Sequence, residues 1–530
     1  MNKRSYFSTF LYLFSSLVLM ACGGSDSGGS DDSTPSVAVS LSSTSIAEGA
    51  EVDANTTTSI TLNYNTPVNI VSSVTITLNG AKVTAQMVNP PSQTVSIPVE
   101  LVPGNSYTLQ IPQGAFISSR NAQSKSPALT LRFTTKKATT PGDDLPDGTA
   151  LEMTRKLGWG WNLGNHFDTS SGADGKHPEW GYWDGAKPTK ALYENLKKAG
   201  ASTVRIPVTW GNYQSISDKK YTIEAAYMAE VKQNVEWAEA AGLNVILNLH
   251  HDEYWQDIKT AATDATVNDQ IKDRITKTWT QIANEFKDKG RFLIFETFNE
   301  IQDGQWGWGA NRTDGGKQYN TLNAWNQTAV DAIRATGGNN ATRWIGVCGY
   351  AANPSLTMDH LTLPTDPANR IMVGVHFYDP SSFTLSPYKP NENGKTEWGH
   401  TAAAGKYDTG SNEDHVRDIF SKLKAKYIDK NIPCYIGEYG CTLHKTDRSN
   451  SFRAYYLEYV CRAAYAYNLP VVIWDNNAND GGGDEKHGYF NHNDGSFLNN
   501  AGDLVKTMIN ATTSTDASYT LDAVYNKAPK

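Results

Sequence analysis

Strand-like and helix-like segments alternate along residues 149–512, and this alternation limits the possible folds more than any other feature. Eight short apolar runs have the composition of buried strands, and amphipathic segments separate most of them. The runs read GWGWNL, STVRIPV, NVILNLH, FLIFETFN, RWIGVC, IMVGVH, CYIGE and VVIW. Eight consecutive β-α units predict an α/β fold of the (β/α)8 (TIM) barrel type.

The segments between these runs have apolar residues at helical spacing. The clearest are 190–200, 225–242 and 412–429, and the first of them ends in Gly200, a common helix terminator. A doubly wound sheet would also alternate strands and helices. However, no glycine-rich phosphate-binding loop follows the first strand, so the pattern favours the closed barrel.

Residues 37–136 have a different composition. Seven short runs of alternating or β-branched residues lie between turn signals such as Asn79-Gly80, which predicts a small all-β, immunoglobulin-like sandwich. The segment has no cysteine and no tryptophan, so we interpret it as a spacer rather than a sugar-binding module. Residues 137–148 are predicted to be a linker, and residues 513–530 a loosely ordered C-terminal tail.

The N-terminus has the pattern of an export signal. Two basic residues precede an apolar stretch over 7–20 that is too short for a comfortable membrane span. The following Leu-Met-Ala-Cys22 resembles a bacterial lipobox, which implies a signal peptide over 1–21 and a lipid on Cys22; a plain secretion signal is the alternative. Residues 22–36 are rich in Gly, Ser and Asp and predict a flexible tether. Such a protein would be lipid-anchored in the cell envelope.

Cysteine and charge exclude some classes of protein. The cysteines beyond Cys22 are Cys348, Cys434, Cys441 and Cys461. They are too few for a disulfide framework and lack zinc-ligand spacing, so we predict buried free thiols. The formal net charge of -8, without a basic stripe, argues against nucleic acid as a partner.

Polar side chains stand at the ends of at least six predicted strands, where a (β/α)8 barrel builds its active site. They are Asn162 and Asn165, Arg205, His250-His251-Asp252, Asn299-Glu300, His376 and Tyr378, Glu438, and Trp474-Asp475-Asn476. Two carboxylates at the ends of buried strands are what acid–base and nucleophilic attack on a glycosidic bond require. Glu300 and Glu438 are therefore the candidate catalytic pair.

The strands that end in Glu300 and Glu438 lie nearly across the predicted barrel, so the two side chains converge on its axis. A carboxyl separation of about 5–5.5 Å would imply retention through a covalent glycosyl-enzyme. A cation such as Arg205 would keep the nucleophile ionised, while burial and a neighbouring carboxylate would favour a protonated acid. Glu296 has the same facing as Glu300 but lies deeper, so we interpret it as a paired interior carboxylate.

Two groups could be taken for metal sites. His250 and His251 are adjacent on a strand and should point to opposite faces, which makes them a poor chelate. Asp480, Asp484 and Glu485 lack the spacing of an ordered calcium loop, and a solvated loop is favoured. We predict no metal and no cofactor.

These residues resemble glycoside hydrolase family 5, the large cellulase family. The motifs are Trp-Asn-Leu-Gly-Asn165, Val-Arg205-Ile-Pro, Leu-His250-His, Asn299-Glu300, His376-Phe-Tyr378, Gly-Glu438 and Trp474, in the family's order. The resemblance implies that Glu300 is the acid/base and Glu438 the nucleophile, with Asn299 on the sugar 2-hydroxyl. It also implies that Arg205 and Tyr378 hold Glu438 ionised. Many members have Pro where this chain has Ile301.

The resemblance further implies the surroundings of the catalytic subsite. His250 and His376 would line it and Trp474 would form its floor, with Asn165 and His251 also in the substrate-binding set. Loop tryptophans suit stacking on sugar rings, and we expect two or three of six to line an open cleft. They are Trp180, Trp183, Trp255, Trp306, Trp308 and Trp398.

The sequence thus predicts a monomeric, retaining endo-β-1,4-glucanase whose partner is a β-glucan such as cellulose, mixed-linkage glucan or xyloglucan. Mannan is the alternative substrate, because the same residues can act on either C2 epimer. A non-catalytic glycan-binding lipoprotein is the alternative from another class. The presence of both carboxylates together with Arg205 and Tyr378 argues against it.

Overall fold

The computed structural model describes residues 38–54, 57–101, 104–136, 148–170, 182–252, 257–389, 393–478 and 485–530. The predictions for residues 1–36, including Cys22, lie outside the described residues, as does nearly all of the 137–148 linker. The chain divides into two compact units, Met1–Ala138 and Thr139–Lys530.

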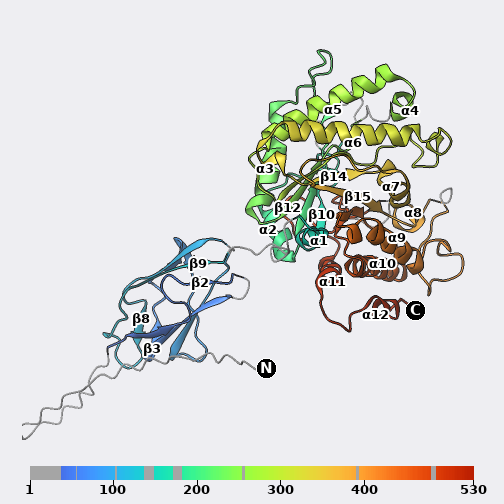
Figure 1. Cartoon of the computed structure of the whole chain (residues 1–530). Coiled ribbons are helices and arrows are strands. Elements are labelled where there is room, and N and C mark those ends of the chain that lie inside the picture. The colour runs from blue at the N-terminus through green and yellow to red at the C-terminus, as the bar shows by residue number, and fades with distance from the viewer. Residues whose placement is uncertain are drawn as a thin grey trace, which may run out of the picture. The chain divides into compact units, whose positions relative to one another are not determined.

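The first unit is a sandwich of two sheets (Figure 1). One sheet has the order β1-β3-β6, with β8 also paired to β3, and the other has the order β2-β9-β7-β4-β5. The strands are β1 Leu41–Thr44, β2 Glu51–Val52, β3 Ser59–Ile70, β4 Ile76–Leu78, β5 Ala81–Val83, β6 Ser92–Pro98, β7 Ser106–Ile111, β8 Phe116–Ser118 and β9 Leu129–Thr135. The all-β prediction agrees with this structure, although β2 and β8 are too short to stand out in the sequence.

The second unit is built on a closed barrel of eight parallel strands in chain order. The strands are β10 Trp159–Asn162, β11 Thr203–Ile206, β12 Asn244–Asn248, β13 Leu293–Glu296, β14 Ile345–Cys348, β15 Ile371–Phe377, β16 Cys434–Tyr439 and β17 Val471–Ile473. Each predicted strand run overlaps one of them, so the predicted (β/α)8 barrel is confirmed.

Helices surround the barrel (Figure 1). The α-helices are α1 Ala150–Leu157, α2 Lys190–Ala199, α3 Ala225–Ala240, α4 Ile258–Ala261, α5 Ala265–Glu285, α6 Lys317–Ala335, α7 Pro354–His360, α8 Ser381–Thr384, α9 Glu413–Lys426, α10 Asp447–Ala466, α11 Gly502–Thr513 and α12 Leu521–Tyr525. Single 3-10 turns cover Gly211–Tyr213, Ala310–Arg312, Gly338–Ala341, Tyr350–Ala352 and Ile428–Lys430. Among the described residues, no helix combines the length and the apolar character needed to cross a membrane.

The predicted helices form for the reason that the sequence suggested. In α2, the large apolar residues Leu192, Tyr193 and Leu196 are buried, and Gly200 ends the helix in a left-handed conformation with φ 110°. The N-terminal end of the barrel is apolar. There Met153 and Leu157 of α1 pack with inward side chains such as Ile246 and Ile294. The opposite end of the barrel is therefore left for polar side chains.

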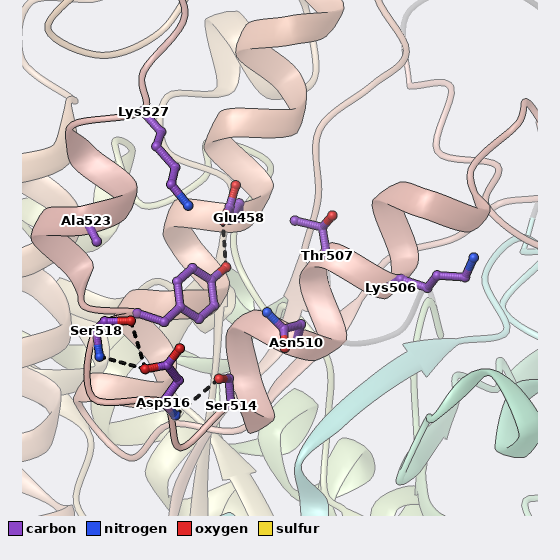
Figure 2. A pocket seen from close by; sticks show the side chains of 10 residues that line it. Glu458, Lys506, Thr507, Asn510, Ser514, Asp516, Ser518, Ala523 and Lys527 are labelled. Atoms are coloured by element: carbon purple, nitrogen blue, oxygen red, sulfur yellow. Dashed lines mark hydrogen bonds between the residues drawn. The ribbon is translucent and has the colours of Figure 1, made fainter.

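The C-terminal segment 513–530 is not the loosely ordered tail that we expected. It forms α12, whose Val524 is fully buried in the main core. The Tyr519 hydroxyl donates to Glu458 of α10 at 2.6 Å, at the edge of a polar, open hollow of about 800 Å³ (Figure 2). The five-residue helix has too few apolar positions to show a period in the sequence, and its order depends on packing against α10.

The four cysteines of the barrel unit are free and buried, as predicted. Cys434 and Cys441, which flank the Glu438 segment, make no disulfide. Burial raises the pKa of both thiols above the ordinary value. Their place is in the packed interior.

Candidate active site

Glu300, Glu438 and His376 meet at the carboxyl end of the barrel. Glu438 is the next-to-last residue of β16, and Glu300 follows the end of β13 by four residues. His376 of β15 pairs with Glu438 after an irregularity in the β15–β16 register. One oxygen of each carboxylate and one His376 nitrogen all lie within 4.8 Å of one another. This spacing fits the short carboxyl separation of retaining glycosidases, since inverting enzymes need about 6.5–9.5 Å.

Arg205 connects the residues below this pair. Its guanidinium donates to Glu438 at 2.7 Å and to Glu296 at 2.7 and 3.0 Å. It also donates to the side-chain oxygens of Asn299, at 2.7 Å, and Asn162, at 3.0 Å. The arginine is fully buried. The geometry of its donors therefore fixes the positions of four side chains from three strands, β10, β13 and β16, or their ends.

Glu296 is a paired interior carboxylate, as predicted. Besides Arg205, it accepts hydrogen bonds from the Tyr435 hydroxyl at 2.5 Å and the Asn248 amide at 2.9 Å. Burial acts to raise the pKa of Glu296, but the charge and hydrogen bonds of Arg205 outweigh it, so the pKa is lowered. Glu296 therefore balances the charge of Arg205 rather than serving as the acid.

Glu438 is held by donors on both oxygens. Arg205 donates to one oxygen, and the Tyr378 hydroxyl donates to the other at 3.0 Å. Burial raises the pKa of Glu438, His376 and Arg205 oppose that rise, and the neighbouring Glu300 adds to it. Arg205 and Tyr378 favour the charged form of Glu438, whereas Glu300 has the His376 Nδ1 as its partner, 2.6 Å away.

The tautomer of His250 follows from its neighbour Asn248. The Asn248 side-chain oxygen accepts from the Val208 N–H at 3.1 Å, and its amide donates to Glu296. This orientation turns the amide N–H toward the His250 Nδ1 at 3.2 Å, so Nδ1 accepts and Nε2 carries the proton. Burial lowers the pKa of His250, which keeps it neutral. The ring therefore presents an N–H donor rather than a lone pair for a metal ion.

The two adjacent histidines do not point apart as we expected. Their ring centroids lie 4.3 Å apart, and an Asp168 oxygen is within 4.8 Å of one nitrogen from each ring. The reason is that β12 ends at Asn248, so the alternation of strand side chains no longer applies at positions 250 and 251. The geometric argument against a chelate was therefore wrong, and the tautomer of His250 replaces it.

Trp474 lies beside the histidines, one residue beyond β17. Its ring is nearly parallel to that of His250, at 11°, with centroids 6.0 Å apart. A side chain at Gly164 would collide with the Trp474 ring and the Asp475 carbonyl, so only glycine fits under the indole. The next residue, Asn165, has a left-handed backbone and accepts the Asp184 N–H through its carbonyl. All predicted site residues thus come from the same end of the barrel.

The loop tryptophans fall into two groups. Trp183, Trp306 and Trp308 are 45%, 58% and 81% exposed, whereas Trp398 is fully buried against Tyr456 and other aromatic side chains. Trp398 is thus a packing residue and not a platform. Trp180 and Trp255 lie outside the described residues, as do Asp480 and Asp484 of the loop that was considered for calcium.

Sequence analysis missed two residues that organise the site. Asn248 fixes the His250 tautomer, and its signal was a polar residue at an inward position of an apolar strand run. His492 lies between the buried carboxylates of Asp184 and Asp475. It had no usable signal, because it stands in a polar loop, 17 residues from Asp475 and 308 from Asp184.

Comparisons with known proteins agree with this geometry. A family model described as "Cellulase (glycosyl hydrolase family 5)" matches residues 164–480. Endoglucanase A of Paenibacillus barcinonensis is 33% identical over 358 residues, which cover 63% of this chain and 84% of that protein. A solved GH5-4 broad specificity endoglucanase from Bacteroides salanitronis is 47% identical, with a TM-score of 0.65, and covers 70% of this chain and 99% of its own. A Bacteroides ovatus GH5 xyloglucanase bound to a XXXG heptasaccharide is 27% identical, with a TM-score of 0.61, and covers 89% of this chain and 100% of its own.

Proposed function

The chain belongs to glycoside hydrolase family 5 and is an endo-β-glucanase, and we propose that it cleaves internal β-1,4 bonds by a retaining, double-displacement mechanism. The observation that carries the mechanism is the meeting of Glu300 and Glu438 within 4.8 Å, where Arg205 and Tyr378 donate hydrogen bonds to Glu438 and His376 is the partner of Glu300. The pair is asymmetric, and the asymmetry assigns the nucleophile.

In the first step, a Glu438 oxygen attacks the anomeric carbon of the bound sugar. The glycosidic C–O bond breaks as Glu300 gives its proton to the leaving oxygen, and a covalent glycosyl-enzyme remains. In the second step, Glu300 takes a proton from water, and the resulting hydroxide displaces Glu438 from the sugar. Two inversions at the anomeric carbon give net retention.

The residues around Glu300 and Glu438 position the sugar and adjust the charges of the two carboxylates. The His376 Nδ1 lies 2.6 Å from a Glu300 oxygen and can accept from the protonated acid or donate to the carboxylate, so it holds Glu300 while its proton moves. His250 offers its Nε2–H to a sugar hydroxyl beside the parallel face of Trp474. Asn299 is oriented through its oxygen by Arg205, which turns its amide N–H toward the position of a 2-hydroxyl.

The substrate class follows from the exposed aromatic side chains. Trp183 lies on the loop after β10, whereas Trp306 and Trp308 lie on the loop that follows Glu300, so exposed indoles stand on loops after different strands. Platforms from different strands suit a groove that binds a polymer along its length. The relatives include a broad specificity endoglucanase and a xyloglucanase, so we assign linear β-1,4-glucans and xyloglucan as substrates.

A substrate panel tests this proposal. The purified protein is incubated with carboxymethylcellulose, mixed-linkage glucan, xyloglucan and mannan, with Glu438→Gln as a matched control. We expect the viscosity of the glucan solutions to fall much faster than reducing ends appear, and only with the wild type. Release of a single disaccharide at constant viscosity, or activity on mannan alone, would overturn the assignment.

We also propose that the protein is a monomer anchored in the cell envelope through a lipid on Cys22. The support is the basic and apolar segment before Leu-Met-Ala-Cys22 and the Gly/Ser/Asp tether after it. Expression of the full chain and of Cys22→Ala in a bacterium fed with labelled palmitate tests the anchor. Label and detergent-phase partition should be lost only in the variant, and an unlabelled wild type would refute the proposal.

A further inference from the structure

His492 lies between two buried carboxylates, Asp184 and Asp475. Asp184 is on the loop after β10, the first barrel strand, and Asp475 is on the loop after β17, the last one. The His492 Nδ1 is 2.8 Å from an Asp184 oxygen, and its Nε2 is 3.2 Å from an Asp475 oxygen. All three side chains are fully buried. A carboxylate can only accept hydrogen bonds, so each ring nitrogen must carry a proton to bond its partner. The geometry therefore makes His492 an imidazolium.

The surrounding charges agree with this state. Burial acts to lower the pKa of His492, but hydrogen bonds from both nitrogens to Asp184 and Asp475 outweigh it and raise the pKa to about 9. Asp184 also faces His166, whose Nδ1 is 3.0 Å from the carboxylate. The second Asp475 oxygen accepts the Trp161 indole N–H at 2.8 Å. Asp184 and Asp475 therefore each have a hydrogen-bonding partner besides His492.

Each carboxylate directly follows a tryptophan of the site. Asp184 follows Trp183, whose indole lies 6.4 Å from the His251 ring. Asp475 follows Trp474, the residue parallel to His250. The His492 cation therefore joins the two chain segments that carry these indoles.

We propose that His492 is a positioning residue whose imidazolium fixes the spacing between Trp183 and Trp474, so that the two indoles bind successive sugars of one glucan chain. This inference rests on the proposed function. A neutral side chain at position 492 would remove the charged link between Asp184 and Asp475. The loops after β10 and β17 would then be joined by uncharged contacts such as the hydrogen bond from the Asn477 amide to the Asp184 carbonyl at 3.0 Å.

The consequence is a dependence on the length of the substrate. A glycoside with one glucose before the scissile bond needs only Trp474, whereas one with three glucose units also needs Trp183 at the correct spacing. Loss of the charged link through His492, which we call the His492 clamp, should therefore lower kcat/KM on the longer substrate more than on the shorter one. General damage to the fold would weaken both equally.

The experiment compares aryl β-glucoside and aryl β-cellotrioside with four proteins: wild type, His492→Gln, Trp183→Ala and the double variant. His400→Gln is the matched control, because His400 also pairs with a buried carboxylate, Glu413 at 2.8 Å, on another side of the barrel. We expect His492→Gln to lower kcat/KM on the cellotrioside at least about tenfold, and on the glucoside less than about threefold. The control variant should change neither value.

The double variant separates positioning from independent effects. If His492 acts through Trp183, adding Trp183→Ala to His492→Gln should cost less than about a further twofold on the cellotrioside. Multiplying effects, or equal losses on both substrates, would overturn the inference. A wild type that hydrolyses neither glycoside nor any β-glucan would instead refute the proposed function.

A second measurement remains available if His492→Gln does not fold. Nitrogen NMR of ¹⁵N-histidine wild-type protein reports the ring protons directly, with His492 assigned by its absence from the spectrum of a folded His492→Phe variant or by its shift in that of Asp184→Asn. Both ring nitrogens should be protonated at pH 7. A singly protonated His492 ring at that pH would contradict the clamp whatever the kinetics show.

Discussion

Arg205 at the floor of the active site is fully buried and bonds two carboxylates, whereas Trp306 and Trp308, on the loop after Glu300 that we call the rim, are more than half exposed. The floor is held by charged hydrogen bonds between side chains from several strands. The rim is carried by loops, and Trp308 has a cationic neighbour, Arg312, 4.7 Å from its ring. Floor residues should therefore determine whether chemistry occurs, and rim residues how well long chains bind.

Loss of the acid/base at the floor should have the largest effect. Glu300→Ala should lower kcat on natural glucan by about 10²–10⁴-fold, because no proton reaches the leaving oxygen. Aryl glycosides with good leaving groups should lose less, and azide should restore turnover and give a β-glycosyl azide. Steady-state kinetics with and without azide check this. If Glu296→Ala shows the azide rescue and Glu300→Ala does not, the acid/base is Glu296 and not Glu300.

Arg205→Lys should destabilise the barrel by about 3–5 kcal/mol, because one ammonium cannot pair both Glu296 and Glu438 in the buried site. Arg132→Lys is the matched control, since Arg132 pairs with Glu48 on the exposed surface of the sandwich and should change little. Tryptophan fluorescence during denaturation reports the barrel alone, because residues 37–136 have no Trp. For the control, loss of the sandwich is followed by circular dichroism. Similar small shifts from both changes would contradict the special role of the floor.

The His492 clamp between floor and rim should make barrel stability depend on alkaline pH. Its pKa is raised to about 9 in the folded state, above the ordinary value of 6.5. The stabilisation is therefore complete below pH 6.5 and is lost as pH rises toward 9, which amounts to about 3 kcal/mol. Tryptophan-detected melting from pH 6 to pH 10 should show this decline in the wild type. A His492→Gln protein with the same slope would exclude His492 as its source.

Trp306→Ala at the rim should raise KM for long oligosaccharides several-fold and leave kcat for short ones nearly unchanged. One sugar face stacked on an indole contributes on the order of 1 kcal/mol, by analogy with aromatic pairs. Val88→Ala is a control for loss of an exposed apolar side chain outside the barrel. Initial rates on a series of oligosaccharides measure the effect. A fall in kcat on short substrates would move Trp306 from the rim to the catalytic subsite.

Removal of the sandwich should have the smallest effect. A soluble protein without residues 23–148 should keep its activity on soluble glucan within a few-fold, because the folded sandwich has its own core and no Trp platform. Its activity is compared with that of the same soluble protein in which residues 23–148 are kept. A large loss, or binding of glucan by the isolated fragment 37–136, would make the sandwich part of substrate recognition.

The sequence predicted the features that repeat or that carry chemistry at strand ends. All eight barrel strands were predictable from apolar runs, and Glu300 and Glu438 from their positions after two of those runs. Features that depend on packing between distant segments were not. The C-terminal helix α12 is ordered by α10, and His250 and His251 come together only because the strand stops at Asn248.

The His492 clamp shows the same limit. Its carboxylate partners lie 308 and 17 residues away in sequence. No local pattern marks a histidine as charged, since its state depends on which groups the fold places at its two nitrogens. The Asp184 and Asp475 contacts had to be seen in the structure.

The central claim is that Glu438 is the nucleophile of a retaining enzyme. A 2-deoxy-2-fluoro cellobioside with a good leaving group should inactivate the wild type, because the fluorine slows release of the glycosyl-enzyme more than its formation. Mass spectrometry of the digested protein should find one added cellobiosyl group, on Glu438. A label on another residue, or a product of inverted anomeric configuration by NMR, would contradict the account.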